Sequence, residues 1–340
     1  MSRFRKFVVP LVAAAILLSA GCSATQQQEP AEPTPTPAIQ TPAAHPINPV
    51  HRFTPTVFGD IVVWMDQSNQ DHDRNIYGHD LSTNLEFPVC VTDGDQTRPA
   101  IDGDIIIWVD ERNGNPDIYG YDMATQTEFA VCTNPAAQND PAIHGDIVVW
   151  ADDRHRAATK SDIYGYHIST GKEFVACDQR DEQRDPDVSG DIIIWQETRN
   201  GNNDIYSYNL SADFNEAEVA VIANMSDQSF PAISDDIVIW IDDINGNPDI
   251  YGYDRVFDEK FAICRHASEQ RNPFFAGDII VWEDDRNGNW DIYGYDMATG
   301  EEFPICIHPA EQYSPAVSGD MVVWEDKRNG NDDIYGARLP

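Results

Sequence analysis

The chain has few positively charged residues for its length. Its 340 residues include 22 Lys and Arg against 58 Asp and Glu, which gives a formal net charge of -36. Phosphate binding depends on Lys and Arg, so this balance argues against a nucleic-acid partner and against attraction to anionic lipid headgroups. Cations, cationic sugars and basic proteins stay open as partners, beside the simpler interpretation that an acidic surface keeps the protein dissolved.

Sequence signatures of catalysis are also missing. The nine His residues show no repeated metal-ligand spacing, and none stands beside a nucleophile motif. One active site in a repetitive chain needs residues that depart from the repeat, and the clearest departures are residues 68–74, 155–161 and 211–216. Surface connections drift readily in sequence, so these stretches alone do not predict catalysis. We therefore expect a non-enzymatic protein and keep an enzyme as the alternative.

What the sequence does contain is a repeat. Seven of its eight Trp residues end an apolar run of the form Asp-Ile-Val-Val-Trp, and successive copies stand 42 to 45 residues apart. The seven are Trp64, Trp108, Trp150, Trp195, Trp240, Trp282 and Trp324. A period in this range is typical of architectures in which each copy forms one supersecondary unit.

Each unit predicts four short strands. In the best-formed copy these are residues 99–102, 105–109, 118–122 and 128–132. Asn113-Gly114, between the second and third strands, predicts a type I′ turn in which both residues have positive φ. The second strand is apolar on both faces, so it must be covered on both sides. We therefore predict an all-β fold, a seven-bladed β-propeller of four-stranded antiparallel blades in which each blade covers its neighbour.

The two ends of the repeat predict how the ring closes. The seventh unit stops at Pro340, directly after its third strand. Residues 48–55 match the loop at 308–315, which places residues 41–47 where an outer fourth strand belongs. We predict that this N-terminal strand closes the last blade, because an outermost strand tolerates the prolines it contains.

Cysteine is scarce, and its placement is regular. The same position of the outer strand holds, in five units, Cys90, Cys132, Cys177, Cys264 and Cys306. Ile222 takes this position in another unit. Equivalent positions of different blades lie farther apart than the ~4.4–6.8 Å between Cα atoms that a disulfide allows. We expect free thiols that pack as small apolar groups, and no metal site formed by them.

The amino-terminal segment predicts export and lipidation. Residues 1–21 carry basic residues, then an apolar stretch, then small residues, which is typical of a secretory signal. The segment Ser19-Ala20-Gly21-Cys22 is similar to the lipobox of bacterial lipoproteins, which makes Cys22 the expected site of lipid attachment. The alternative is an ordinary signal peptide that contains a cysteine.

The predicted lipid anchor leads to a prediction for the domain organisation and the location of the protein. Residues 22–40 form a linker rich in Pro, Thr and Gln, and the propeller takes residues 41–340. We expect an extracytoplasmic protein that meets the cell membrane through its N-terminal lipid alone.

The loop between the second and third strands carries the pattern Asp-x-Arg-Asn-Gly-Asn-x-Asp, as in residues 110–117. Asp and Asn oxygens around a glycine are typical of Ca²⁺ loops, but the arginine stands where such loops place a ligand oxygen. In the structural interpretation, Asp110, Arg112 and Asp117 form a charged cluster that stabilises the hairpin. We favour the structural interpretation and predict no metal or cofactor, with Ca²⁺ as the alternative.

The same loops supply candidate binding residues. In a propeller the loops after the second and fourth strands gather at one rim, so these loops form one face. The candidate partner-binding residues are Arg112, Asn115, Arg199, Asn202, Arg286, Asn289, Arg328 and Asn331. We expect none of them to be catalytic.

These motifs give the chain a family resemblance. Gly-Asp-Ile-Val-Val-Trp, Arg-Asn-Gly-Asn-x-Asp-Ile-Tyr-Gly-Tyr-Asp and the Thr-Gly-x-Glu-Phe hairpin at 299–303 resemble the TolB-like β-propeller repeat proteins over residues 55–340. Cell-surface repeat lipoproteins are the members that it resembles most. The resemblance implies a binding or scaffold module, and it supplies no catalytic residues.

Three functions follow as hypotheses. The leading one is a lipid-anchored, extracytoplasmic propeller that binds a protein or polysaccharide through one face. The alternative is a propeller hydrolase or lyase that acts on extracellular or cell-wall carbohydrate, and the third is a structural element of a surface layer. A central pocket with clustered unique carboxylates or His favours the enzyme, whereas a pocket lined only by repeated Asn, Asp and Arg favours binding.

Overall fold

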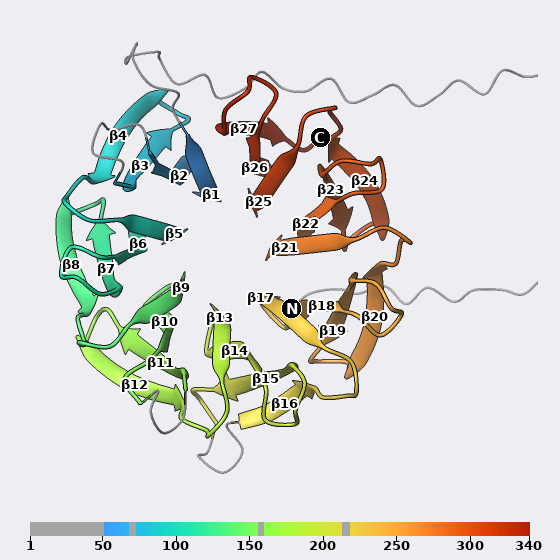
Figure 1. The fold of residues 1–340 in the computed structure, drawn as a ribbon, viewed down its shortest axis with the longest axis horizontal. Coiled ribbons are helices and arrows are strands. Elements are labelled where there is room, and N and C mark those ends of the chain that lie inside the picture. Colours follow the sequence, from blue (N-terminus) through green and yellow to red (C-terminus); the bar gives the residue numbers. More distant parts are fainter. Residues whose placement is uncertain (1–50, 68–72, 156–159, 213–217) are drawn as a thin grey trace, which may run out of the picture. The chain divides into compact units, whose positions relative to one another are not determined.

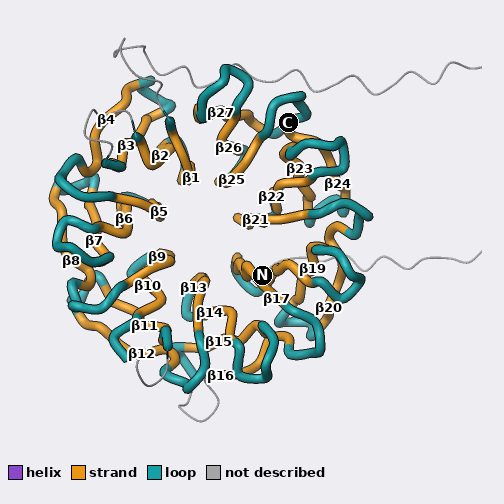
Figure 2. Tube along the Cα trace, viewed as in Figure 1, coloured by secondary structure: helices purple, strands orange, loops and turns teal. Residues whose placement is uncertain are grey.

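The fold is a ring of antiparallel sheets. The computed structural model describes residues 51–67, 73–155, 160–212 and 218–340, and every regular element among them is a β-strand. Seven sheets stand around a central axis as the blades of a β-propeller (Figure 1). Figure 2 shows the same ring as strands joined by short loops. None of the described segments contains a helix long and apolar enough to cross a membrane.

The strands follow the chain from the axis to the edge of each blade. Blade 1 contains β1 (Arg52–Phe58), β2 (Ile61–Asp66), β3 (Asn75–Asp80) and β4 (Leu85–Cys90). Blade 2 contains β5 (Gln96–Asp102), β6 (Ile105–Asp110), β7 (Asp117–Asp122) and β8 (Thr127–Cys132). Blade 3 contains β9 (Gln138–His144), β10 (Ile147–Asp152), β11 (Asp162–His167) and β12 (Lys172–Cys177). Blade 4 contains β13 (Gln183–Ser189), β14 (Ile192–Glu197), β15 (Asp204–Asn209) and β16 (Glu218–Ile222).

The remaining three blades repeat this order. Blade 5 contains β17 (Gln228–Ser234), β18 (Ile237–Asp242), β19 (Asp249–Asp254) and β20 (Glu259–Cys264). Blade 6 contains β21 (Gln270–Ala276), β22 (Ile279–Asp284), β23 (Asp291–Asp296) and β24 (Glu301–Cys306). Blade 7 contains β25 (Gln312–Ser318), β26 (Met321–Asp326) and β27 (Asp333–Arg338).

The core lies between the blades, as the two-faced second strand predicts. Each repeat tryptophan is at most 1% exposed. Trp195 on β14 shares a buried cluster with Val149 and Ile163 of the preceding blade. Indole rings bury more apolar area than most side chains, so this contact is a large part of the energy that holds neighbouring blades together. The prediction of a seven-bladed, all-β propeller is confirmed.

Blades 1 and 7 meet through the same contact. Trp64 of blade 1 shares a buried cluster with Ala316, Val323 and Ile334 of blade 7. The Arg52 N–H also donates a 2.9 Å hydrogen bond to a backbone carbonyl of blade 7. Blade 7 has three strands within the described residues, and the predicted closing strand at 41–47 lies outside them. The tryptophan packing therefore joins the first and last blades directly.

The turn between β6 and β7 differs from the prediction. Gly114 has a φ of 89°, but Asn113 is not among the residues with positive φ. The Gly114 N–H donates to the carbonyl of Glu111 at 2.9 Å, and six residues, 111–116, separate the paired Asp110 and Asp117 instead of two. The type I′ prediction is wrong, because a loop of this length turns through a type I geometry that favours glycine at its last position.

The third strand has a glycine at its centre in most blades because of its neighbour on the outer strand. A Cβ on Gly120 would lie 2.5 Å from Cζ of Phe129, which is its cross-strand partner. Blade 4 instead pairs Ser207 with Val219. Ser207 is larger than the glycine of the other blades, and its partner Val219 is smaller than their phenylalanine.

This pairing gives a stability prediction. Gly120→Ser is expected to lower the free energy of unfolding by about 1–3 kcal/mol, because it overpacks against Phe129. Adding Phe129→Val, which recreates the pair of blade 4, is expected to recover part of the loss. Urea denaturation measures both changes, and a single variant as stable as the unmodified protein would contradict the packing argument.

Candidate functional site

A cavity of about 740 Å³ lies on the axis of the ring. Its walls are the inner strands of all seven blades, β1, β5, β9, β13, β17, β21 and β25, which Figure 1 shows around the centre. Small-molecule and peptide sites in proteins have volumes of roughly 300–1,000 Å³. The cavity is therefore large enough for a ligand.

Several residues of each inner strand line this cavity, and one of them in each strand has a left-handed backbone conformation. The φ values at these positions lie between 47° and 53°. We call these residues the channel ring: Thr54, Arg98, Asp140, Asp185, Phe230, Asn272 and Ser314. Each one precedes a proline, and the pairing with the second strand shifts register there, as in a β-bulge. Bulges of this kind re-aim side chains beside functional sites.

The channel ring is strained. A left-handed φ is uncommon for any residue except glycine, and it is an outlier for β-branched Thr54 and bulky Phe230. The residue before a proline also prefers an extended backbone. Such positions cost about 1–3 kcal/mol each, and they persist where the surrounding structure holds them, which is frequent at binding and active sites. Glycine would remove most of this cost, yet no blade has it at this position.

The residues of the channel ring also differ from blade to blade. The proline that follows each ring residue is the same in all seven blades, whereas the ring itself holds six residue types. The backbone conformation is shared by all seven positions, so it does not depend on any one of these side chains. Its charged members, Arg98, Asp140 and Asp185, belong to blades 2 to 4, and the other ring residues are neutral.

The cavity carries net negative charge. Among the described residues, Arg98 lines it together with Asp102, Asp140, Asp185, Asp187 and Asp235. Arg98 forms an ion pair with Asp140. Burial raises the pKa of Asp185, although the positive charges of Arg184 and Arg98 oppose this change.

Asp187 is fixed at the boundary between blades 4 and 5. It accepts hydrogen bonds from the backbone N–H of Ile233, at 2.8 Å, and of Val188, at 2.9 Å. Burial raises the pKa of Asp187 to about 6, although these hydrogen bonds favour the charged form. Sequence reasoning missed Asp185 and Asp187, since the only signal was the variable residue before each repeated proline.

The predicted rim arginines are bound by the protein itself. Arg286 donates to both oxygens of Asp284, from Nε at 2.9 Å and from Nη2 at 2.6 Å, and it forms an ion pair with Glu302. Its guanidinium lies 4.1 Å from the centroid of the Tyr293 ring. The Trp282 Nε1–H donates to the same Asp284 at 3.1 Å. Burial opposes ionisation of Asp284, but the bonds from Arg286 and Trp282 outweigh it and lower the pKa of this carboxyl.

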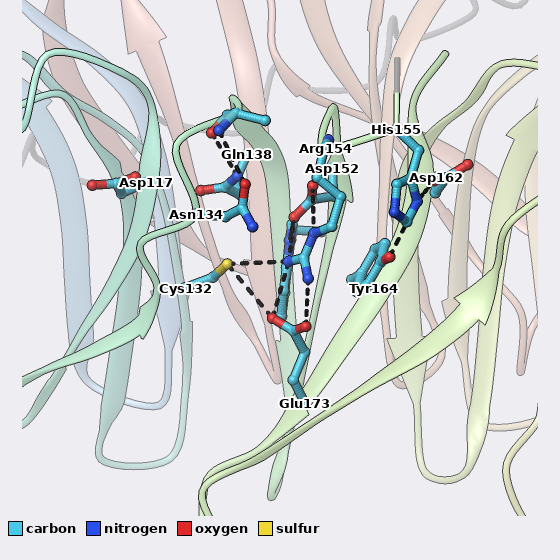
Figure 3. A network of polar contacts seen from close by, with 12 residues as sticks. Asp117, Cys132, Asn134, Gln138, Asp152, Arg154, His155, Asp162, Tyr164 and Glu173 are labelled. Atoms are coloured by element: carbon cyan, nitrogen blue, oxygen red, sulfur yellow. Dashed lines mark hydrogen bonds and ion pairs between the residues drawn. The ribbon is translucent and has the colours of Figure 1, made fainter. Parts of the chain in front are cut away.

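The same network recurs around the ring. Arg112, Arg199 and Arg328 bind the corresponding carboxylates of their own blades. Figure 3 shows the copy in blade 3, where Arg154 lies between Asp152, Glu173 and the Cys132 thiol. The predicted cluster of Asp110, Arg112 and Asp117 is partly wrong. Arg112 pairs with Asp110 as predicted, but its second partner is Glu128 on the outer strand and not Asp117.

Blades without that arginine supply another cation. Blade 5 has Ile244 at the arginine position, and Lys260 on the outer strand donates to Asp242 at 3.0 Å instead. In blade 1, Arg52 donates to Asp66 at 3.3 Å. In every described blade, the carboxylate two residues after the repeat tryptophan therefore has a cation beside it.

The predicted rim asparagines join consecutive blades. Asn289 Nδ2 contacts Asp291 Oδ1 at 3.1 Å and the carbonyl of His308, in the loop to the next blade, at 2.8 Å. Asn115 and Asn202 make the same kind of contact, and Asn331 donates to Asp333 at 2.8 Å. The loops after the second and fourth strands therefore lie together on one rim. A part for these residues in partner binding stays a prediction.

The five cysteines within the described residues are free and buried, as predicted. Burial raises the pKa of Cys90, Cys132, Cys264 and Cys306 to about 12, so these thiols stay protonated. The donor atoms of Cys177, Glu197 and Glu218 lie within 4.8 Å of one another. The Arg199 guanidinium pairs with both of these carboxylates, so this donor set does not fit a metal ion.

Comparison with known proteins supports the fold. No protein-family model matches the chain, and no curated protein sequence matches it. An oligogalacturonate lyase from Vibrio parahaemolyticus matches with 14% identity and a TM-score of 0.65, over 86% of this chain and 91% of that chain. The β-propeller domain of the Trilobed protease from Pyrococcus furiosus matches with 13% identity and a TM-score of 0.66, over 86% and 96%.

The resemblance to TolB is supported at the level of the fold. TolB from Acinetobacter baumannii matches with 15% identity and a TM-score of 0.54, over 72% of this chain and 63% of that chain. Prolyl endopeptidases match as well, but this chain spans only 47% of their length. At these identities the similarities show a shared propeller and nothing about activity.

The cation exchange in blade 5 gives a stability prediction. Arg286→Ile leaves the buried Asp284 without its cation and is expected to lower the free energy of unfolding by about 3 kcal/mol. Adding Glu302→Lys recreates the Ile244–Lys260 arrangement and is expected to restore most of that stability. Guanidinium denaturation measures both variants, and a double variant no more stable than the single one would show that the cation is not what the site requires.

Proposed function

We propose that the protein is a binding module whose partner, a protein or a polysaccharide, enters the central cavity and contacts the channel ring. The observation that carries this proposal is the set of seven strained backbone positions that hold differing side chains around one cavity. A purely structural ring has no reason to keep Phe230 or Arg98 in a conformation that glycine adopts without strain.

The rim residues have a supporting part in this proposal. The side chain of Arg286 is 17% exposed, and its guanidinium is already bonded to two carboxylates. Releasing it for a partner would leave Asp284 buried without a cation, which is costly. The arginines and asparagines of the rim therefore hold the blades and loops in place, and the channel ring contacts the ligand.

The proposed location follows from the sequence. Cys22, outside the described residues, receives the lipid that holds the protein at the membrane on its extracytoplasmic side. The acidic composition fits this role, because it leaves the lipid as the main contact with an anionic membrane and disfavours nucleic acid.

A glycine substitution in the channel ring separates function from stability. Phe230→Gly relieves backbone strain, so its free energy of unfolding is expected to equal or exceed that of the unmodified protein. The same variant is expected to lose at least tenfold in affinity for whichever member of an immobilised glycan and peptide panel the unmodified protein retains.

A matched control sits on the opposite face. Phe257→Gly removes an equally large ring that is 64% exposed in the turn between β19 and β20. It is expected to leave binding to the panel unchanged. Binding that survives Phe230→Gly, together with a loss of stability in that variant, would place Phe230 in the structure rather than in the site.

The hydrolase or lyase alternative is favoured by the carboxylates of blade 4 and by His144, which line the central cavity and are not repeated in every blade. A carboxyl with a pKa near 6 can act as a proton donor close to neutral pH, and Asp187 has this property. The structural similarity to an oligogalacturonate lyase makes oligogalacturonate a suitable probe.

The two functions predict different results with that probe. Under the binding proposal, no shortened or unsaturated product forms from oligogalacturonate or from neutral cell-wall glycans. An enzyme that uses protonated Asp187 would form product at a rate that falls as the pH rises above about 6, because the proton is then lost, and Asp187→Asn would abolish it. Chromatography of the reaction mixture distinguishes these outcomes.

A further inference from the structure

Blade 5 exposes large apolar side chains on the rim and at the cavity. Met225 is 99% exposed, Ile244 is 54% exposed and Phe230 is 49% exposed. We call these three residues the blade 5 strip. In a protein with a net charge of -36, exposed apolar groups gathered on one blade are candidates for a binding surface.

The three residues of the blade 5 strip lie on connected segments. Met225 belongs to the loop before β17, and Ile244 belongs to the loop after β18. Asp242 Oδ1 joins these loops, because it accepts from Ser226 Oγ at 2.8 Å and from the Ile244 N–H at 3.0 Å. Phe230 lies on β17, which pairs with β18, so the strip runs from the rim to the cavity.

Packing inside the protein does not explain the apolar character of this strip. Ile244 stands where most blades have an arginine, and Lys260 has taken over the ion pair with Asp242. Arginine at position 244 would serve the blade equally well, as it does in blade 6. In blade 5 the positive charge is therefore on Lys260 of the outer strand, and the rim position holds the aliphatic Ile244.

The blade 5 strip ends beside the carboxylates of the cavity. Asp187 of blade 4 accepts from the Ile233 N–H of β17, the strand that also carries Phe230, at 2.8 Å. Asp185 and Asp187 therefore line the wall next to Phe230. An apolar surface leads directly to a region of negative charge.

We propose that the blade 5 strip and these carboxylates bind a segment of a protein partner that carries apolar side chains followed by Lys or Arg. This inference rests on the proposed binding function and decides between its two partner classes. Burial of Met225 and Ile244 gains free energy against apolar side chains, whereas sugar hydroxyls find no hydrogen-bonding partner on them. A basic side chain complements the carboxylates, both in approach and in the bound state.

The test uses the full-length protein and fluorescent peptides of designed composition. A short peptide that combines Leu and Lys is expected to bind, and its affinity is expected to fall at high salt because the carboxylates contribute through charge. The matched peptide of Leu and Glu is expected not to bind. Met225→Ser with Ile244→Gln, and separately Phe230→Ser, are each expected to weaken binding of the Leu-Lys peptide by roughly tenfold or more.

The opposite face supplies the control. Val256 and Phe257 are 63% and 64% exposed on the turn between β19 and β20, at the other end of the blade. Val256→Ser with Phe257→Ser is expected to leave peptide binding unchanged. Equal binding of both peptides, or equal weakening by the two double variants, would overturn the proposal.

The outcome also separates this inference from the function on which it rests. Chitosan oligosaccharide is the comparison probe, because it is cationic but is a polysaccharide. If chitosan binds in a manner that requires Phe230 and the Leu-Lys peptide does not bind, the protein-partner inference fails and the cavity remains a binding site. If every probe binds Phe230→Ser as well as it binds the unmodified protein, both proposals fail.

Discussion

The structure depends on the contact between each tryptophan and the blade that precedes it. The indole ring is buried between two sheets that are apolar on both faces, so no blade has a complete core alone. The indole N–H is a polar group inside this core and needs a hydrogen-bond partner. A carboxylate accepts it, and a cation that lies over a neighbouring tyrosine balances the carboxylate. One buried ring thus accounts for three regular features of the repeat: the carboxylate, the cation and the tyrosine that accompany it.

Because these contacts lie between the sheets, the residue types on the inner strand of each blade can vary. The positions that join blades are nearly the same in every copy, and exchanges such as Ile244 with Lys260 preserve their charges. The channel ring keeps its backbone conformation in every blade while its side chains, which line the cavity, differ in type. The protein therefore combines a constant frame with an asymmetric channel ring, whose charged residues lie in blades 2 to 4.

The sequence predicted the features of the fold that depend on the repeat period and on the pattern of apolar residues. The spacing of the tryptophans and the two apolar faces of strands such as β6 were sufficient for the propeller, and equivalent positions on separate blades were sufficient for the free thiols. It did not predict that Arg112 pairs with Glu128, because that contact depends on the register of two hairpins. The left-handed channel ring was also missed, since its residue types have no common property and a bulge creates the conformation. Lipidation of Cys22 and the strand at 41–47 remain predictions.

The cysteines have a consequence for how the molecule matures. The five described thiols are buried, protonated and held in separate blades, so no covalent cross-link contributes to the ring. The chain can reach its native state without an oxidant or a disulfide isomerase. Formation of the ring, over the described residues, therefore depends on packing and hydrogen bonding in reducing and in oxidising surroundings alike.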